Sequence, residues 1–245
     1  MSNGHLHPIT QATLQTATIF AELGFEIAYG KELIPEKENF DLLNFKPDHP
    51  ARDVHDTFWI KGTRGTATSL VPRTHISSLQ VPFLRENPPP IRMISSGPVY
   101  RAEATDATHD FQFHYTEGLA VEKGATLAHL KGVLEYFLKK FFMRNDIKMR
   151  LRPGNFPFVE PGLEIDMWYE GSGGGSARGG RWLEVLGAGM VHPAVLKNAN
   201  IDPDTYSGYA FGMGVTRLLK LRHDIDDIRN FYSGDLRFVN QFSYP

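Results

Sequence analysis

The spacing of apolar residues predicts two amphipathic helices in the first 143 residues. Residues 8–23 have a proline in the first turn and Gly24 just behind the last turn, and residues 124–143 have leucines and phenylalanines at helical spacing. We expect each helix to bury one face. That face is formed by Leu14, Ala17, Phe20 and Ala21 in the first helix, and by Leu127, Leu130, Leu134, Phe137, Leu138 and Phe141 in the second.

Residues 111–121 alternate as a long strand does, with five apolar residues in one parity: Phe111, Phe113, Tyr115, Leu119 and Val121. Glu117 falls in the same parity. A buried carboxylate is costly unless it pairs with a charge or binds a cationic group of a ligand. A bulge at Gly118 is the other interpretation. Shorter strands are predicted at residues 25–29, 56–60, 91–95, 98–102, 147–152, 163–169 and 182–186.

The segments between these elements have no such period. We expect an irregular connection at residues 39–52 and a hairpin turn at residues 61–69. A polar loop with His109 is expected at residues 105–110. Residues 171–180 have the composition of a glycine–serine linker. A dense polar group between residues 74 and 80 indicates either ligand contact or ordinary satisfied side chains: Thr74, His75, Ser77, Ser78 and Gln80.

Two or three helices and about eight strands, with few βαβ alternations, favour an α+β fold. We expect an antiparallel sheet flanked by helices rather than a parallel Rossmann sheet.

Residues 206–221 combine a strand, a glycine turn and a helix. Tyr209 and Phe211 should point to one side of the strand and Ala210 to the other. The chain then turns through Gly212 and Gly214 into a helix whose first turn has Arg217. Glycines at such a junction let a ligand approach the backbone, and a helix N-terminus with an arginine suits phosphate. A tight turn with a surface arginine is the alternative.

The composition excludes several classes of protein. The chain has 245 residues, a net charge of −2 and no cysteine, so no overall basic field indicates nucleic acid and neither disulfides nor thiolate metal sites are available. No apolar run approaches the ~18 residues that a membrane helix needs, and the N-terminus lacks a signal-peptide pattern. We expect a cytoplasmic protein with no membrane contact.

Several motifs are more specific. An arginine on a strand, in Val99-Tyr100-Arg101-Ala102-Glu103, and the glycine-rich strand and helix with Arg217 resemble the second and third motifs of class II aminoacyl-tRNA synthetases. Six further segments resemble the α subunit of bacterial phenylalanyl-tRNA synthetases: His49-Pro50-Ala51-Arg52, Asp56-Thr57-Phe58-Trp59, Arg73-Thr74-His75, Thr105-Asp106-Ala107-Thr108-His109, Phe156-Pro157-Phe158-Val159-Glu160-Pro161 and Gly189-Met190-Val191-His192-Pro193. The resemblance covers residues 7–242 and implies a single catalytic domain over residues 1–245.

The resemblance implies activation of phenylalanine by ATP, in which the amino-acid carboxylate attacks the α-phosphorus and displaces pyrophosphate. No protein nucleophile is needed, so catalysis rests on positioning and charge stabilisation. Arg101 would grip the α-phosphate and the substrate carboxylate, and Arg217 would hold the far phosphate. Mg²⁺ would bridge phosphate oxygens, and Glu160 would bind a metal shared with a partner subunit. The ATP-binding residues are then Arg101, Glu103, Phe113, Gly212 and Arg217.

An amino-acid pocket follows from the same resemblance. Its residues would be Trp59, His75, Ser77, Gln80, Tyr115, Glu117, Phe156, Phe158, Val159, Ala210 and Gly212. Glu117 would orient the network around the α-ammonium, the phenylalanines suit an aromatic ring, and Ala210 leaves room for it. No residue offers a partner for a tyrosine hydroxyl, which would cost about 1–3 kcal/mol to leave unpaired.

The implied partners are tRNA(Phe) and a β subunit, in an α2β2 heterotetramer. The chain departs from the family in four ways: Tyr115 replaces a glutamine that contacts substrate, Thr216 replaces a glutamate, Lys31 replaces the first motif's proline, and the N-terminal coiled-coil arm has no counterpart. Two other functions stay open, namely an amino-acid-adenylating paralogue with a non-tRNA acceptor and a non-catalytic binding module. Retention of the charged residues Arg101, Glu103, Glu117 and Arg217 argues against the module.

Overall fold

Seven strands form one sheet in the computed structural model, which describes residues 4, 6–53, 56–170 and 180–242. All neighbours are antiparallel except the first pair, which is parallel. In sheet order the strands are β1 (Glu26–Ile27), β4 (Ile91–Tyr100), β5 (Gln112–Glu122), β9 (Ser207–Gly214), β8 (Arg181–Val191), β7 (Val159–Tyr169) and β6 (Met149–Phe156). A separate antiparallel ribbon joins β2 (Leu33–Pro35) to β3 (Leu70–Pro72). The α+β prediction is confirmed.

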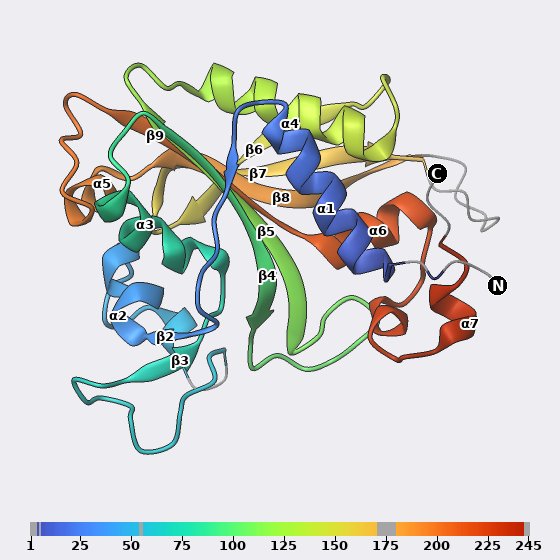
Figure 1. The fold of residues 1–245 in the computed structure, drawn as a ribbon, viewed down its shortest axis with the longest axis horizontal. Coiled ribbons are helices and arrows are strands. Elements are labelled where there is room, and N and C mark those ends of the chain that lie inside the picture. Colours follow the sequence, from blue (N-terminus) through green and yellow to red (C-terminus); the bar gives the residue numbers. More distant parts are fainter. Residues whose placement is uncertain (1–3, 5, 54–55, 171–179, 243–245) are drawn as a thin grey trace.

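Three helices cover one face of the sheet: α1 (Pro8–Ala21), α4 (Leu127–Phe142) and α6 (Val215–His223). Figure 1 shows α1 passing in front of the sheet, with α4 and α6 beside it, and α1 contacts both of these helices. Phe20 of α1 stacks on Phe137 of α4 and on Phe211 of β9, with ring centroids 4.9 and 5.0 Å apart. The C-terminal elements η4 (Ile228–Phe231) and α7 (Leu236–Val239) follow α6, and Phe231 joins the same core.

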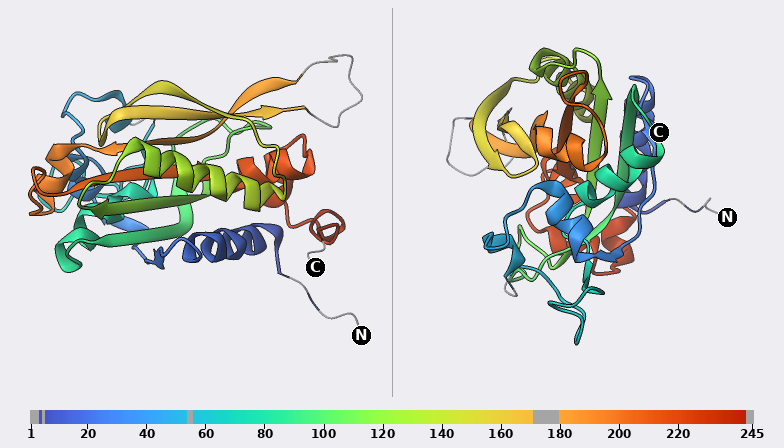
Figure 2. Two further views of the ribbon diagram at one scale, coloured as in Figure 1. Left: turned by 90° about the horizontal axis from the view of Figure 1, so that it is seen from above. Right: turned by 90° about the vertical axis from the view of Figure 1, so that its left-hand side faces the viewer.

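Shorter elements build up the opposite face, together with a second core. They are α2 (Glu36–Asn39), η1 (Asp41–Leu43), η2 (Pro50–Arg52), η3 (Ile76–Leu79), α3 (Gln80–Glu86) and α5 (Pro193–Asn198). Phe40 and Leu43 are fully buried there. In the left view of Figure 2 these shorter elements gather at the left-hand end of the molecule, whereas α1 and α6 lie towards the other end.

The register of β5 and β9 assigns their residues to the two faces. Phe211 pairs with Gly118 and belongs to the core under the long helices, whereas Ala210 pairs with Leu119 and belongs to the second core. The predicted alternation around Ala210 is therefore confirmed. Glu117 shares the parity of Leu119, so its carboxylate faces the same side as Ala210. No bulge interrupts the pairing of β5 with β4 or β9 at Gly118.

Several local predictions were wrong. Residues 56–60 form no strand, and the turn at residues 61–69 closes by a backbone bond from Ile60 N–H to Leu70 O (3.2 Å) instead of a hairpin ladder. Residues 39–52 contain parts of three short helical elements. Of the strand predicted at residues 25–29, only β1 forms a strand in the sheet. The two strands predicted on either side of Gly97 form the single strand β4. Of the linker-like residues 171–180, only Gly180 lies within the described residues.

The buried face of α1 also differs from the prediction. Leu14 and Ala21 are exposed, because the stripe that packs on the sheet runs through Ile9, Ala12, Thr16, Ile19 and Phe20. These residues follow the helical repeat more closely than the predicted set. The predicted face of α4 is buried except for Leu127 at its first turn. Within the described residues, none of the helices has both the length and the apolar composition to cross a bilayer.

Candidate active site

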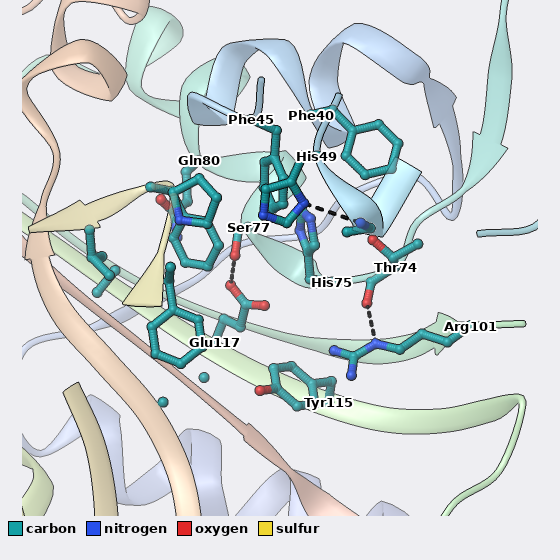
Figure 3. A pocket seen from close by; sticks show the side chains of 18 of the residues that line it. Phe40, Phe45, His49, Thr74, His75, Ser77, Gln80, Arg101, Tyr115 and Glu117 are labelled. Carbon is teal, nitrogen blue, oxygen red and sulfur yellow. Dashed lines mark hydrogen bonds between the residues drawn. The ribbon is translucent and has the colours of Figure 1, made fainter. Parts of the chain in front are cut away.

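A cavity of about 430 Å³ lies on the face of the sheet that Glu117 faces. Figure 3 shows its walls: Phe40, Phe45 and His49 come from the irregular segment after α2, His75, Ser77 and Gln80 from the η3–α3 region, and Tyr115 and Glu117 from β5. Residues 155–159 of the β6–β7 hairpin and Ala210 and Gly212 of β9 also line it. The volume suits a small ligand.

Glu117 is the buried anion of this cavity. Its carboxylate accepts a hydrogen bond from the Ile76 backbone N–H (2.9 Å) and another from the Ser77 hydroxyl. Burial raises the pKa of Glu117 to about 7, although both hydrogen bonds favour the charged form. A cationic group of a ligand would offset that burial cost, and an α-ammonium is such a group.

Two neutral polar side chains stand beside Glu117 with unused hydrogen-bonding capacity. Both amide atoms of Gln80 are buried without a partner among the described residues, and neither ring nitrogen of His75 has a well-formed hydrogen bond there. Burial and the charge of Arg101 lower the pKa of His75 to about 3, so the imidazole is neutral at any working pH. Buried polar groups without partners are costly, which indicates that a ligand supplies donors and acceptors here.

The other end of the cavity is apolar. Phe156 and Phe158 lie with ring centroids 6.1 Å apart, and Phe45 lies 6.0 Å from Phe158. Val159 and Ala210 are buried beside them. Rings at these separations suit edge-to-face or tilted contact with an aromatic ligand.

A second cavity of about 670 Å³ adjoins the first. The two cavities share Arg101, Glu103, Tyr115 and Gly187. The second also includes Phe113, Arg217 and Lys220, together with Thr108, His109 and Asp110 of the polar loop. Two ligands, one in each cavity, could therefore meet at the four shared residues.

Arg101 lies at this junction, and its side chain interacts with four other residues. Its Nε donates to the Thr74 carbonyl (3.1 Å), and its guanidinium lies 5.1 Å from the ring centroid of Phe113 and 5.9 Å from that of Tyr115. The Glu103 carboxylate is 3.8 Å from Nη1. Figure 3 shows the guanidinium beside Tyr115, reaching from the end of β4 towards the cavity. A cation so placed can contact an anion in either cavity.

Arg217 lies on the first turn of α6, which begins after Gly214 with no side-chain cap. The side chain is exposed to the second cavity and makes no hydrogen bond or ion pair within the described part of the chain. An uncapped helix N-terminus and an unpaired guanidinium suit an anion. Thr216, beside it, is buried and bonds to the Tyr232 hydroxyl, which also accepts the His114 backbone N–H (3.0 Å).

Tyr115 forms part of the wall between the cavities. Burial and the neighbouring Glu117 raise the pKa of Tyr115 to about 12, so its hydroxyl remains protonated. Among the described residues the hydroxyl has no hydrogen-bond partner. It is therefore available to a ligand.

Most of the predicted site residues lie together. On the first cavity are His75, Ser77, Gln80, Arg101, Glu103, Tyr115, Glu117, Phe156, Phe158, Val159, Ala210 and Gly212, and Phe113 and Arg217 lie on the second. Trp59 is absent from both linings, and its place in the site stays a prediction. Its ring lies behind Phe40, with centroids 6.4 Å apart, and under the Arg64 guanidinium at 4.9 Å.

Glu160 is also absent from both linings. Its side chain is 76% exposed and lies 3.3 Å from His192 Nε2. No set of three or more histidine, aspartate or glutamate side chains in the described residues is arranged to hold a metal without other ligands. A role for Glu160 in a metal site shared with a partner subunit stays a prediction.

Sequence reasoning missed part of each cavity. Phe40, Phe45 and His49 belong to a segment without period, so nothing in the pattern placed them at the first cavity. The polar loop at residues 105–110 with His109 was a signal for the second cavity, whereas Arg181, Glu184 and Lys220 had none.

Arg101 directly follows β4, Glu117 lies on β5, and Arg217 lies in the first turn of α6, all around the two cavities. The sequence profile described as "tRNA synthetases class II core domain (F)" matches residues 1–242, and the chain belongs to this family.

Curated relatives are named phenylalanine–tRNA ligase alpha subunit. The protein from Xylella fastidiosa (strain 9a5c) is 48% identical over 240 residues, covering 98% of this chain and 68% of the relative. The protein from Dehalococcoides mccartyi (strain CBDB1) is 49% identical over 244 residues, covering 98% and 70%. Pyrrolysyl-tRNA synthetase from Desulfitobacterium hafniense has a similar structure, with a TM-score of 0.69 at 17% identity, covering 94% of this chain and 75% of that one. This last likeness concerns the fold alone.

Proposed function

We propose that this chain activates phenylalanine with ATP and, together with a β subunit, transfers it to tRNA(Phe). The observation that carries the proposal is the junction of the two cavities at Arg101. An amino acid in the first cavity and ATP in the second would bring the carboxylate and the α-phosphorus together beside this guanidinium. Positioning and charge stabilisation then account for catalysis without a protein nucleophile.

Phenylalanine suits the first cavity in both of its parts. Glu117 receives the α-ammonium, while Gln80 and His75 supply the hydrogen bonds that the polar end of the amino acid needs. The ring occupies the apolar end between Phe156 and Phe158. Among the described residues, the side chains at that end are apolar, and tyrosine would leave its hydroxyl without a partner there.

The second cavity suits ATP because arginine side chains line it. Arg217 binds the far phosphate and Arg101 the α-phosphate, with Glu103 and Phe113 at the nucleotide. Mg²⁺ is commonly held by one or two carboxylates together with phosphate oxygens and water. Glu103 and Glu184 both line this cavity, so the residues present fit such an ion. The ion would neutralise charge on the phosphates during the displacement.

The remaining parts of the proposal rest on the resemblance to the relatives. The chain acts as one catalytic domain, assembles with a β subunit as an α2β2 heterotetramer, and works in the cytoplasm. The metal at Glu160 belongs to this assembly, because a largely exposed carboxylate needs further ligands from a partner.

Amino-acid-dependent ATP–pyrophosphate exchange tests the proposal. The purified chain, alone and co-expressed with a bacterial β subunit, is assayed against each of the twenty amino acids, and tRNA(Phe) charging is measured in parallel. We expect exchange with phenylalanine well above exchange with tyrosine, and charging only in the presence of β.

Each contrary result has a distinct meaning. No exchange with any amino acid, with or without β, would contradict an enzyme and leave a binding module. Exchange with phenylalanine but no charging with β would indicate transfer to another acceptor. Preferred exchange with tyrosine would contradict the assignment of the apolar end of the cavity.

A further inference from the structure

The loop at residues 105–110 is ordered around one carboxylate. The Asp106 side chain accepts hydrogen bonds from the backbone N–H groups of Thr108 (2.6 Å) and His109 (2.8 Å) and from the Thr108 hydroxyl (2.8 Å). It also lies 3.2 Å from His109 Nδ1. The Asp106 N–H donates to the His109 carbonyl (2.9 Å), which closes the loop. The loop is therefore a compact unit that presents Thr108 and His109 to the second cavity.

One atom of this unit, the Ala107 carbonyl oxygen, is hydrogen-bonded twice to the C-terminal part of the chain. The carbonyl oxygen of Ala107 accepts a hydrogen bond from Lys220 Nζ (3.2 Å) and a second from the Ile228 backbone N–H (3.1 Å). The bond to Lys220 joins residues 113 positions apart.

Lys220 lies on α6, three residues after Arg217, and both face the second cavity. A lysine ammonium that lines a phosphate-binding cavity would ordinarily be expected to bind the phosphate. Here, however, Nζ is already bonded to two carbonyl oxygens, those of Ala107 and Asp226 (2.5 Å). An ammonium has three donors, so two are used within the protein.

We propose that Lys220 is a positioning residue that fixes the distance between the loop at residues 105–110 and helix α6. The loop carries His109 and the helix carries Arg217, so the bond through Ala107 sets the separation of two walls of the nucleotide cavity. Lys220 thus acts on the nucleotide through these walls and leaves the amino-acid cavity unchanged. The inference rests on the proposed use of the second cavity for ATP.

The variant Lys220→Met keeps the length of the side chain and removes its donors. Two readouts are needed: the KM values for ATP and phenylalanine in pyrophosphate exchange with the β subunit present, and hydrogen–deuterium exchange of the backbone amides of residues 105–110. Lys220→Arg retains the positive charge and hydrogen-bond donors. Lys140→Met is the matched control, because the Lys140 ammonium, on the surface of α4, bonds among the described residues to Glu22 and Tyr136 and lines neither cavity.

In Lys220→Met we expect the KM for ATP to rise about tenfold, as for loss of one charge-assisted hydrogen bond, with the KM for phenylalanine within about twofold of the wild-type value. The amides of Asp106, Thr108 and His109 should exchange about tenfold faster. Lys220→Arg should recover most of both effects, and Lys140→Met should show neither.

Wild-type amide exchange in the loop of Lys220→Met would overturn the proposal. A raised KM for ATP with unchanged loop exchange would make Lys220 a direct phosphate ligand, and no change in either would make it a surface residue. If Lys220→Met does not fold, Lys220→Gln replaces it in the same measurements. If the wild-type protein shows no exchange activity, the proposed function fails, while the amide measurement still decides whether Lys220 holds the loop.

Discussion

Glu117 of β5 and Gly212 of β9 lie directly opposite each other, and a Cβ on residue 212 would stand 2.9 Å from Glu117 Cγ. The same atom would be 2.8 Å from Cε1 of Tyr115. The absence of a side chain at this position therefore lets a buried carboxylate and a phenol share one wall of the cavity.

Gly212→Ala should consequently displace Glu117 or Tyr115. We expect kcat/KM for phenylalanine in pyrophosphate exchange to fall about 10- to 100-fold, since small displacements of binding groups have effects of this size. Gly132→Ala on α4 is the control, because its Cβ would meet nothing within 4 Å and Gly132 lines neither cavity. Equal activity of the two variants would argue against a tight fit at Gly212.

The pH profile should report Glu117. Only the ionised carboxylate attracts an α-ammonium, and the pKa of Glu117 is about 7. Below this pH the fraction of free protein with the charged form falls about tenfold per unit, so kcat/KM for phenylalanine should fall with it. His75 contributes nothing in this range, because its pKa is about 3.

Ser77→Ala provides the test of that assignment. The Ser77 hydroxyl favours the charged carboxylate, so its removal should raise the pKa of Glu117 and move the break in the profile to higher pH. A break that stays in place would mean that another group is responsible.

Gly118→Ala should destabilise the fold rather than the site. A Cβ at this position would lie 2.1 Å from Cζ of Phe211, which is buried in the core under the long helices. Overpacking of this kind costs about 1–3 kcal/mol. Urea denaturation measures the loss, and the double variant Gly118→Ala/Phe211→Leu should be more stable than the two separate losses predict. Additive losses would show that the two side chains do not compete for space.

The strands β5 and β9 were predictable because period-two alternation decides both their existence and the direction of their side chains. Glu117 fell among the apolar residues of one parity, which left two interpretations: a partner for a buried carboxylate or a bulge at Gly118. The structure buries the carboxylate and has no bulge there. The resemblance to the family then indicated Arg101 and Arg217 as phosphate-binding residues.

The irregular wall of the first cavity was not predictable in the same way. Phe40 and Phe45 lie in segments whose course is decided by tertiary contacts, and Trp59 turned out to pack behind Phe40. The bond between Lys220 and Ala107 joins distant parts of the chain, so no local pattern could indicate it. Period and motif thus predict which strands carry the site, while loop contacts complete it.

Arg217→Ala should abolish pyrophosphate exchange and leave the fold intact. Its guanidinium contacts no other charged group among the described residues, so its loss should leave the free energy of unfolding within about 0.5 kcal/mol of the wild-type value. Loss of an arginine that holds phosphate should lower kcat/KM for ATP by about 1,000-fold or more. The control is Arg144→Ala, since Arg144 forms its ion pair with Asp146 at the surface and lines neither cavity. Near-normal exchange in Arg217→Ala would overturn the phosphate assignment.

Tyr115→Gln should tighten phenylalanine binding. An amide at this position offers a donor and an acceptor to the polar end of the amino acid, whereas the phenol offers a single hydroxyl and occupies more of the shared wall. One added hydrogen bond to a charged group should lower the Kd for phenylalanine about tenfold, measured by titration calorimetry. Tyr115→Phe separates the two causes, because it keeps the ring and removes the hydroxyl; it should bind phenylalanine no more tightly than the wild-type protein. An unchanged or higher Kd for Tyr115→Gln would count against contact between this side chain and the substrate.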